Sequence, residues 1–171
     1  MTLTSTLIIG ATSIAVLTSA VYLLPAHKRV ERSVKINASP ADVYHLLKSN
    51  TGFQAFNPYK DKDPELKITL SGPAEGVGSS FAFSGKDGKG TQTITHVQEN
   101  RAVTMLIDLG PMGQPEQTFE LQRADDGTRV TWGVNASFAL NPIGRIFGLF
   151  MENLQGPTIE RGLKNLTGAV E

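Results

Sequence analysis

The sequence predicts an α+β fold in which a curved, seven-stranded antiparallel sheet is covered by one long C-terminal helix and preceded by one N-terminal transmembrane helix. Three patterns support this prediction. Residues 3–24 carry no charge, residues 66–138 alternate apolar and polar side chains, and residues 141–166 repeat apolar side chains with helical period. Alternation is typical of strands with one buried face, and a spacing of three to four residues is typical of an amphipathic helix.

Length and composition are those of a single domain. The chain has 171 residues with 40% hydrophobic content, which is enough to bury one core. Sixteen basic side chains balance sixteen acidic ones, so we expect no nucleic-acid partner. The sequence has no cysteine, which excludes disulfides, thiolate nucleophiles and Cys-ligated zinc.

The uncharged segment at residues 3–24 is long enough to span a bilayer, at about 33 Å for a helix rising about 1.5 Å per residue. We therefore predict a transmembrane anchor at residues 1–25, a basic juxtamembrane linker at 26–32 and a domain at 33–171. A cleaved signal peptide is the alternative, but it usually has a basic start and a shorter apolar stretch. Basic residues follow the segment and none precedes it, which predicts a single-pass protein with its domain on the cytoplasmic side.

Small side chains at Ala11, Ala15 and Ser19 form a ridge along the predicted transmembrane helix. Such a ridge lets a second helix approach closely. A transmembrane partner is therefore one hypothesis, although small residues are also common in membrane helices for no such reason.

The first elements of the domain are a strand and two short helices. Residues 30–37 alternate, with Val30 and Ile36 on the apolar side. Ser39 and Pro40 then form the start signal of a helix, an N-cap hydroxyl followed by proline. A second short helix is expected at residues 51–56.

Six further strands are expected in a meander, because period-two alternation recurs between turn-forming residues. An antiparallel sheet with one apolar face needs a cover on that face. The predicted strands fall near residues 66–70, 81–83, 91–97, 101–109, 117–121 and 130–138.

The C-terminal helix should provide that cover. Five apolar residues fall on one arc and are expected to pack on the sheet. They are Ile143, Ile146, Phe147, Phe150 and Leu154. Pro157 cannot donate to the carbonyl four residues earlier, so a bend is expected near Gly156. Gly144 and Gly148 either widen an entrance or allow close packing, and Leu149 is expected to be exposed.

Several motifs in this order resemble the polyketide cyclase/dehydrase-like branch of the START superfamily, also called SRPBCC. They are Ile36-Asn37-Ala38-Ser39-Pro40-Ala41-Asp42-Val43-Tyr44, Phe56-Asn57-Pro58-Tyr59, Gly76-Val77-Gly78, Gly127-Thr128-Arg129-Val130-Thr131-Trp132, and Gly156-Pro157 with Glu160-Arg161-Gly162-Leu163. The resemblance covers residues 30–166. It implies the helix-grip fold, with a deep apolar cavity between the sheet and the last helix. Members of the family bind lipids, sterols, hormones or polyketides, and some are cyclases or aromatases.

The resemblance implies binding of a hydrophobic small molecule or lipid, and together with the anchor predicted at residues 1–25 it predicts a membrane-anchored binding protein. Residues on core-facing strand positions and on the last helix are the candidate ligand contacts. They are Phe81, Phe83, Met105, Ile107, Phe119, Trp132, Val134, Phe147, Phe150 and Met151. The alternatives are an accessory subunit of a larger membrane complex and a cyclase or dehydratase, which a cavity containing both His96 and a tyrosine would favour. We assign no catalytic residue, cofactor or metal, since the histidines have no ligand spacing.

Overall fold

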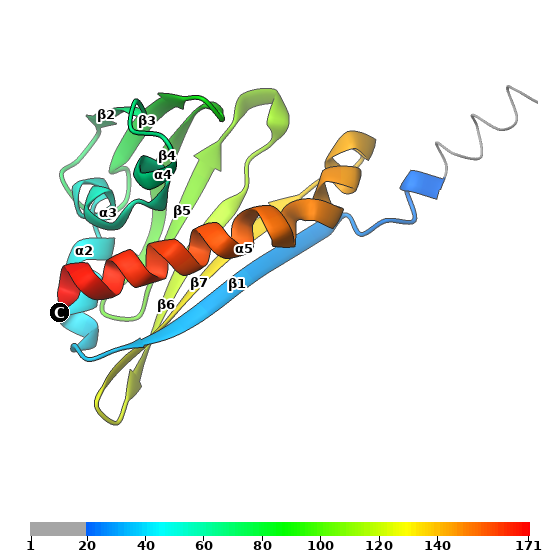
Figure 1. The fold of residues 1–171 in the computed structure, drawn as a ribbon. Helices are drawn as coiled ribbons and strands as arrows, with labels where there is room; N and C mark the ends of the chain where they lie inside the picture. Colours follow the sequence, from blue (N-terminus) through cyan, green and yellow to red (C-terminus); the bar gives the residue numbers. More distant parts are fainter. Residues whose placement is uncertain (1–19) are drawn as a thin grey trace, which may run out of the picture.

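The computed structural model describes residues 20–171 and shows one seven-stranded antiparallel sheet with four helices (Figure 1). The strands lie in the order β1-β7-β6-β5-β4-β3-β2, so the first and last strands of the chain are neighbours. Their bounds are β1 His27–Ile36, β2 Lys67–Ser71, β3 Ser80–Gly85, β4 Gly88–Gln98, β5 Ala102–Asp108, β6 Glu116–Ala124 and β7 Gly127–Ser137. The helices are α2 Pro40–Leu47, α3 Asn50–Phe56, α4 Pro58–Lys62 and α5 Pro142–Val170, with a 3-10 turn at η1 Gly110–Met112.

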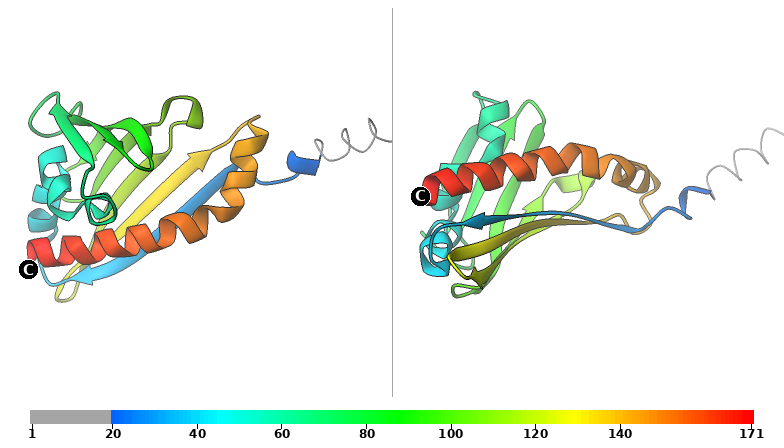
Figure 2. Two further views of the ribbon diagram at one scale, coloured as in Figure 1. Left: turned by 45° about the horizontal axis from the view of Figure 1, so that its top comes forward. Right: turned by 60° about the horizontal axis from the view of Figure 1, so that its bottom comes forward.

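The sheet curves around α5, and the three short helices lie beside the C-terminal half of α5 (Figure 2). This arrangement is the helix-grip fold, so the predicted fold of the domain is confirmed. The predicted start of α2 is also confirmed, because Ser39 accepts from the backbone of Asp42 in a capping box. Sequence analysis missed α4, which begins after Asn57, whose side chain accepts from the backbone N–H of Tyr59 at 3.0 Å.

The core is centred on Trp132 of β7, whose side chain is fully buried. The ring of Phe119 lies 4.6 Å from that of Trp132 between centroids, and Phe53 and Phe56 of α3 meet the same indole edge-on at 6.1 and 6.2 Å. Gly162 brings α5 against the other side, where a Cβ would lie 2.2 Å from Trp132. The indole is therefore enclosed by two strands and two helices.

The N-terminal half of α5 packs differently from the prediction. The five residues of the predicted covering stripe, from Ile143 to Leu154, are all exposed. The sides of Gly144 and Gly148 face the sheet instead, where a Cβ would lie 2.9 and 2.6 Å from Phe138. These glycines allow close packing, which turns the larger side chains outward; the prediction that the stripe packs on the sheet is wrong. Leu149 is exposed, as predicted.

The expected bend near Gly156 is also wrong in its position. Helix α5 continues through Pro157, and its sharp turn lies earlier, in the light-orange part (Figures 1 and 2). Arg32 of β1 explains the continuity, because it bonds Glu152 at 2.6 Å and Glu160 at 2.7 Å. These two carboxylates lie on either side of Pro157, so both halves are held to the same strand.

Strand β1 begins at His27, so most of the segment expected as a linker at residues 26–32 belongs to the sheet. His27 pairs with Ser137 and the register continues to Ile36. The predicted anchor, including the ridge at Ala11, Ala15 and Ser19, lies almost wholly outside the described residues. Within residues 20–171, no helix has the length and apolar character needed to cross a membrane.

Candidate functional site

A cavity of about 350 Å³ lies between the sheet, α4 and the N-terminal half of α5. Most of its wall is apolar and comes from strands β2, β3, β5 and β7, with contributions from α3 and α5. The apolar lining consists of Phe53, Leu66, Ile68, Phe81, Phe83, Ile107, Leu109, Pro115, Val134, Phe147 and Leu154. The cavity opens at one side to solvent, where the exposed residues Phe147 and Leu154 form part of its rim.

Half of the ten predicted ligand contacts line this cavity. They are Phe81, Phe83, Ile107, Val134 and Phe147. The other five do not: Met105, Phe119, Trp132 and Met151 are buried in the core, and Phe150 is exposed. The cause is α3, because Phe53 and Phe56 fill the space over Phe119 and Trp132. That filling displaces the cavity toward β2 and β3.

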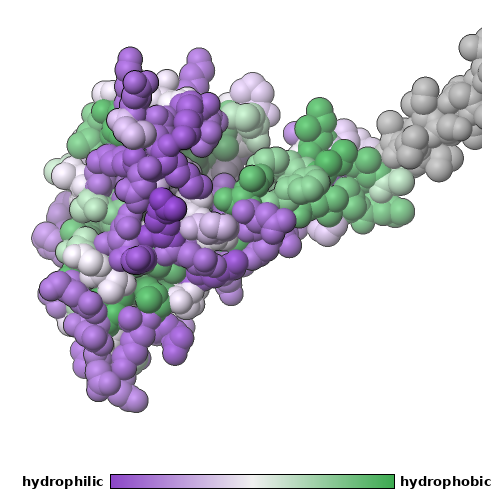
Figure 3. Space-filling view, viewed as in Figure 1, coloured by the Kyte–Doolittle hydropathy of each residue, from purple (hydrophilic) through white to green (hydrophobic). Residues whose placement is uncertain are grey.

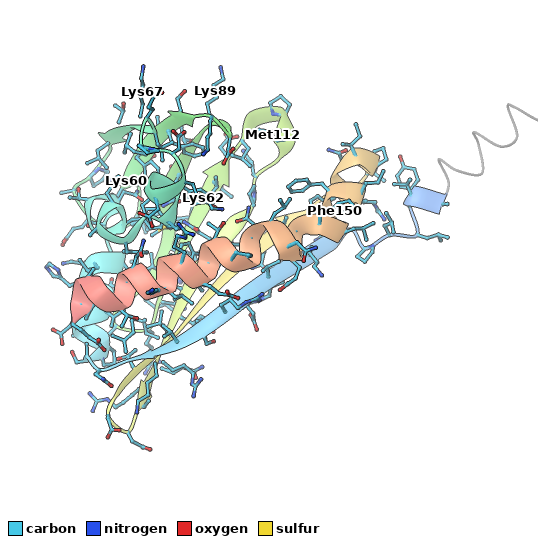
Figure 4. The ribbon with its side chains drawn as sticks, viewed as in Figure 1. Lys60, Lys62, Lys67, Lys89, Met112 and Phe150 are labelled. Carbon is cyan, nitrogen blue, oxygen red and sulfur yellow. The ribbon has the colours of Figure 1, made fainter. Side chains whose placement is uncertain are left out.

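The cavity has a polar side, formed by α4 and the middle of α5. Tyr59 donates its hydroxyl to Oε1 of Gln155 at 3.2 Å. The ammonium of Lys62 donates to the hydroxyl of Thr158, and in Figure 4 Lys62 lies between α4 and α5. None of Tyr59, Lys62, Gln155 and Thr158 is among the ligand contacts predicted from the sequence. The Asn57-Pro58 helix start was the available signal, since α4 carries both Tyr59 and Lys62.

The environment of Tyr59 keeps its phenol neutral. Removal from water, and secondarily the negative charge of Asp87, raises the pKa of Tyr59 to about 12. The phenol hydrogen is used by Gln155, which leaves the phenol oxygen as an acceptor. Lys62 uses one of its three donors on Thr158. This side of the cavity therefore offers the ammonium of Lys62 as a donor and the phenol oxygen of Tyr59 as a neutral acceptor, and the carboxylates of Asp63 and Asp87 also line the cavity.

Gln92 also faces the cavity, but its amide is already occupied. Its nitrogen donates to Asn50 Oδ1 at 3.1 Å and contacts the sulfur of Met105 at the same distance. Its oxygen accepts from Gln117 at 2.6 Å, and Asn50 in turn donates to the carbonyl of Ser79. These amides are buried and bond one another. We interpret them as part of the scaffold, because buried polar groups require partners.

His96 lies outside the cavity. The register between β4 and β5 shifts between Ile94 and His96, so the alternation is broken there. Ile94 points into the core, while His96 is exposed and lies 3.3 Å from the amide of Gln98. The histidine and tyrosine pair expected of a cyclase does not form here. Within residues 20–171 no three His, Cys, Asp or Glu side chains group in a way that could hold a metal ion.

A family model described as "Polyketide cyclase / dehydrase and lipid transport" matches residues 27–171. The chain belongs to this family. The match begins at the residue where β1 begins, and it includes every strand and helix named above. The predicted relationship to the polyketide cyclase-like branch of SRPBCC is thereby confirmed. A search of curated proteins gives no match.

Solved structures share the fold of this protein at low sequence identity. The di-domain ARO/CYC StfQ from the steffimycin biosynthetic pathway has a TM-score of 0.62 at 7% identity, covering 85% of this chain and 51% of StfQ. Ara h 8.0201 has a TM-score of 0.59 at 13% identity, and the match covers 84% of this chain and 97% of Ara h 8.0201. Protein MLL2253 from Mesorhizobium loti has a TM-score of 0.57 at 16% identity, and the match covers 83% of this chain and 96% of MLL2253. These likenesses concern the fold alone.

Proposed function

We propose that this protein is a membrane-anchored binding protein that holds a hydrophobic small molecule or lipid between the sheet and α5. The observation that carries the proposal is the cavity of about 350 Å³ with largely apolar walls. Protein interiors are packed closely and leave few voids larger than a water molecule. A space of this size lies within the range of small-molecule sites, about 300 to 1,000 Å³. The family description, which includes lipid transport, agrees with this use.

The polar side of the cavity defines the chemistry of the ligand further. Lys62 has donors and a positive charge available beside an apolar chamber. The complementary ligand has an apolar body and one acceptor group, such as a carboxylate or a ketone. Its acceptor oxygen would lie at Lys62, and any hydroxyl it carries would donate to the phenol oxygen of Tyr59.

Binding of a matched pair of fluorescent probes tests this chemistry. The probes are 11-(dansylamino)undecanoic acid and its methyl ester, which differ in the charged acceptor. A hydrogen bond to a charged group contributes about 1.5 to 3 kcal/mol, and about 1.4 kcal/mol is tenfold in affinity. Lys62→Met should therefore weaken binding of the acid roughly tenfold or more and change binding of the ester much less.

Lys67 supplies the matched control. It lies on β2 at the same end of the fold but is exposed and points away from the cavity (Figure 4). Lys67→Met removes the same charge from the molecule without removing a donor from the site. The proposed ligand chemistry would be overturned if Lys62→Met and Lys67→Met changed the affinity for the acid equally. It would also be overturned if the unaltered protein bound neither probe.

The membrane anchor is proposed from the uncharged residues 3–24, with the domain on the cytoplasmic side because Lys28 and Arg29 follow that segment. The full chain should sediment with membranes and resist extraction by alkaline carbonate. Attachment through exposed charges alone would be released by salt, because such charges are screened within about 10 Å at 0.1 M. Recovery of a shortened protein without the segment would support the signal-peptide alternative, and cleavage of the domain by protease outside intact cells would reverse the orientation.

A further inference from the structure

We infer that the N-terminal half of α5 is a membrane-docking helix that lies in the headgroup region of the bilayer to which the protein is anchored. The contact surface is the outward stripe formed by Ile143, Ile146, Phe147, Phe150 and Leu154, called here the outer face of α5. This inference rests on the anchor in the proposed function. It adds that the folded domain itself contacts lipid, in one fixed orientation.

The outer face of α5 is apolar and unusually open. Its side chains are between 44% exposed, at Ile146, and 77% exposed, at Ile143. At about 100° per residue, the five side chains fall within one arc of the helix. Single exposed apolar residues are common, but a contiguous apolar surface of this kind marks a contact site. Within residues 20–171, no other element covers this arc.

Polar side chains on the other side of the same helix bond the rest of the fold. Arg145 donates to the carbonyl oxygens of Ala139, Tyr22 and Leu24, at 2.6 to 3.0 Å. Glu152 accepts from Arg32 of β1 at 2.6 Å. The positions of this half that face the fold include Gly144, Gly148 and Met151, so most of its large apolar side chains point outward. That arrangement fits a helix lying in a membrane interface, whose apolar face is buried about 5 to 10 Å into lipid.

The position of the outer face selects a bilayer over another apolar partner. Arg145 bonds Tyr22 and Leu24, the last residues of the uncharged segment proposed to cross the membrane, and its guanidinium lies 5.4 Å from the ring centre of Tyr22. Leu23 and Leu140, exposed by 88% and 79%, add to the apolar surface at this end. Figure 3 shows the hydrophobic surface concentrated at this end of the fold, where the described chain begins. A bilayer that holds the segment is thus within reach of the outer face.

Docking in this orientation has a consequence for the cavity. Phe147 and Leu154 belong both to the outer face of α5 and to the cavity lining. The apolar wall of the cavity is therefore continuous with the surface that contacts lipid. A hydrophobic ligand would pass between the bilayer and the cavity along apolar side chains.

Single-cysteine labelling of the full chain tests the inference, and the sequence suits it because it contains no other cysteine. Ile143→Cys places a probe on the outer face of α5, and Asp125→Cys places the control in the β6–β7 hairpin, at the far end of the sheet (Figure 1). Each variant is labelled with an NBD fluorophore. Each is then reconstituted at high dilution into vesicles of phosphatidylcholine and phosphatidylglycerol, with and without doxyl-labelled lipid.

The expected result is several-fold stronger quenching by doxyl lipid at position 143 than at position 125, with the reverse order for aqueous iodide. Equal quenching of both positions by iodide would show that the outer face of α5 meets water and would overturn the inference. Protection of position 143 from both quenchers would show a protein cover, such as a second copy, and would also overturn it. Flotation of the same vesicles reports the anchor separately: protein that floats but gives either adverse pattern retains the anchor and loses the docking helix.

Discussion

Gly162 gives the sharpest test of how closely α5 packs on the sheet. In Gly162→Ala, the new Cβ would lie 2.2 Å from Cζ3 of Trp132 and 3.2 Å from Cγ of Pro58. Trp132 cannot move away, because Phe119 and the α3 phenylalanines enclose it. Overpacking of this kind costs about 1 to 3 kcal/mol. Alanine in place of glycine favours the helix by up to about 1 kcal/mol, so the net loss should be about 0 to 2 kcal/mol.

Gly168 is the matched control, six residues further along α5. A Cβ at Gly168 would meet no atom within 4 Å, so Gly168→Ala should gain the stability of alanine's higher helix propensity without any cost of overpacking. The free energies of unfolding of the two variants should therefore differ by about 1 to 3 kcal/mol, with Gly162→Ala the less stable. Urea unfolding of the full chain in detergent, followed by fluorescence of the single tryptophan, measures this difference. Equal stability of the two variants would refute the close contact between α5 and Trp132.

Three further substitutions test separate contacts. In the folded protein the pKa of Tyr59 is raised to about 12 from 10.0. The neutral phenol therefore contributes fully to the free energy of unfolding below pH 10, and this contribution is lost as the pH rises toward 12. The loss amounts to at most about 3 kcal/mol. Urea titrations should show that the free energy of unfolding falls less between pH 10 and 12 in Tyr59→Phe than in the unaltered protein. Identical pH profiles of the two proteins would contradict the raised pKa. Arg32→Met should lower the melting temperature, and less so at high salt, because it breaks ion pairs to Glu152 and Glu160; a salt-independent loss would assign the effect to packing instead. Asn141→Ala should cost about 0.5 to 2 kcal/mol by removing the N-cap of α5, and unchanged stability would mean that the cap is unimportant.

Sequence patterns predicted the sheet well because strand alternation is a local consequence of one buried face. Val103 and Met105 of β5 share a face and are both buried, as their spacing indicates. His96 shows where this reasoning fails. One irregularity in β4 reverses the side on which the following residues lie, and no residue near Ile94 signals it.

The candidate site was harder to predict than the fold because it depends on which side chains fill the space first. Trp132 and Phe119 are on core-facing positions, as predicted, but α3 covers them with two aromatic rings. Periodicity identifies the apolar stripe of α5 without saying what it faces. Two glycines that pack on Phe138 determine that the stripe faces outward, and periodicity alone does not indicate this packing.

If the cavity holds a hydrophobic ligand, a larger side chain that fills the cavity should displace that ligand. Ile107 lines the cavity and is only partly buried, so Ile107→Trp should occupy ligand space at little cost in stability. Native mass spectrometry of both proteins, released from their own membrane in mild detergent, measures what they carry. We expect an apolar molecule to copurify with the unaltered protein and to be lost from Ile107→Trp, with the unfolding free energies of the two proteins within about 1 kcal/mol of each other. A bare mass for the unaltered protein, together with destabilisation of Ile107→Trp by about 1 to 3 kcal/mol as in a filled core, would contradict it.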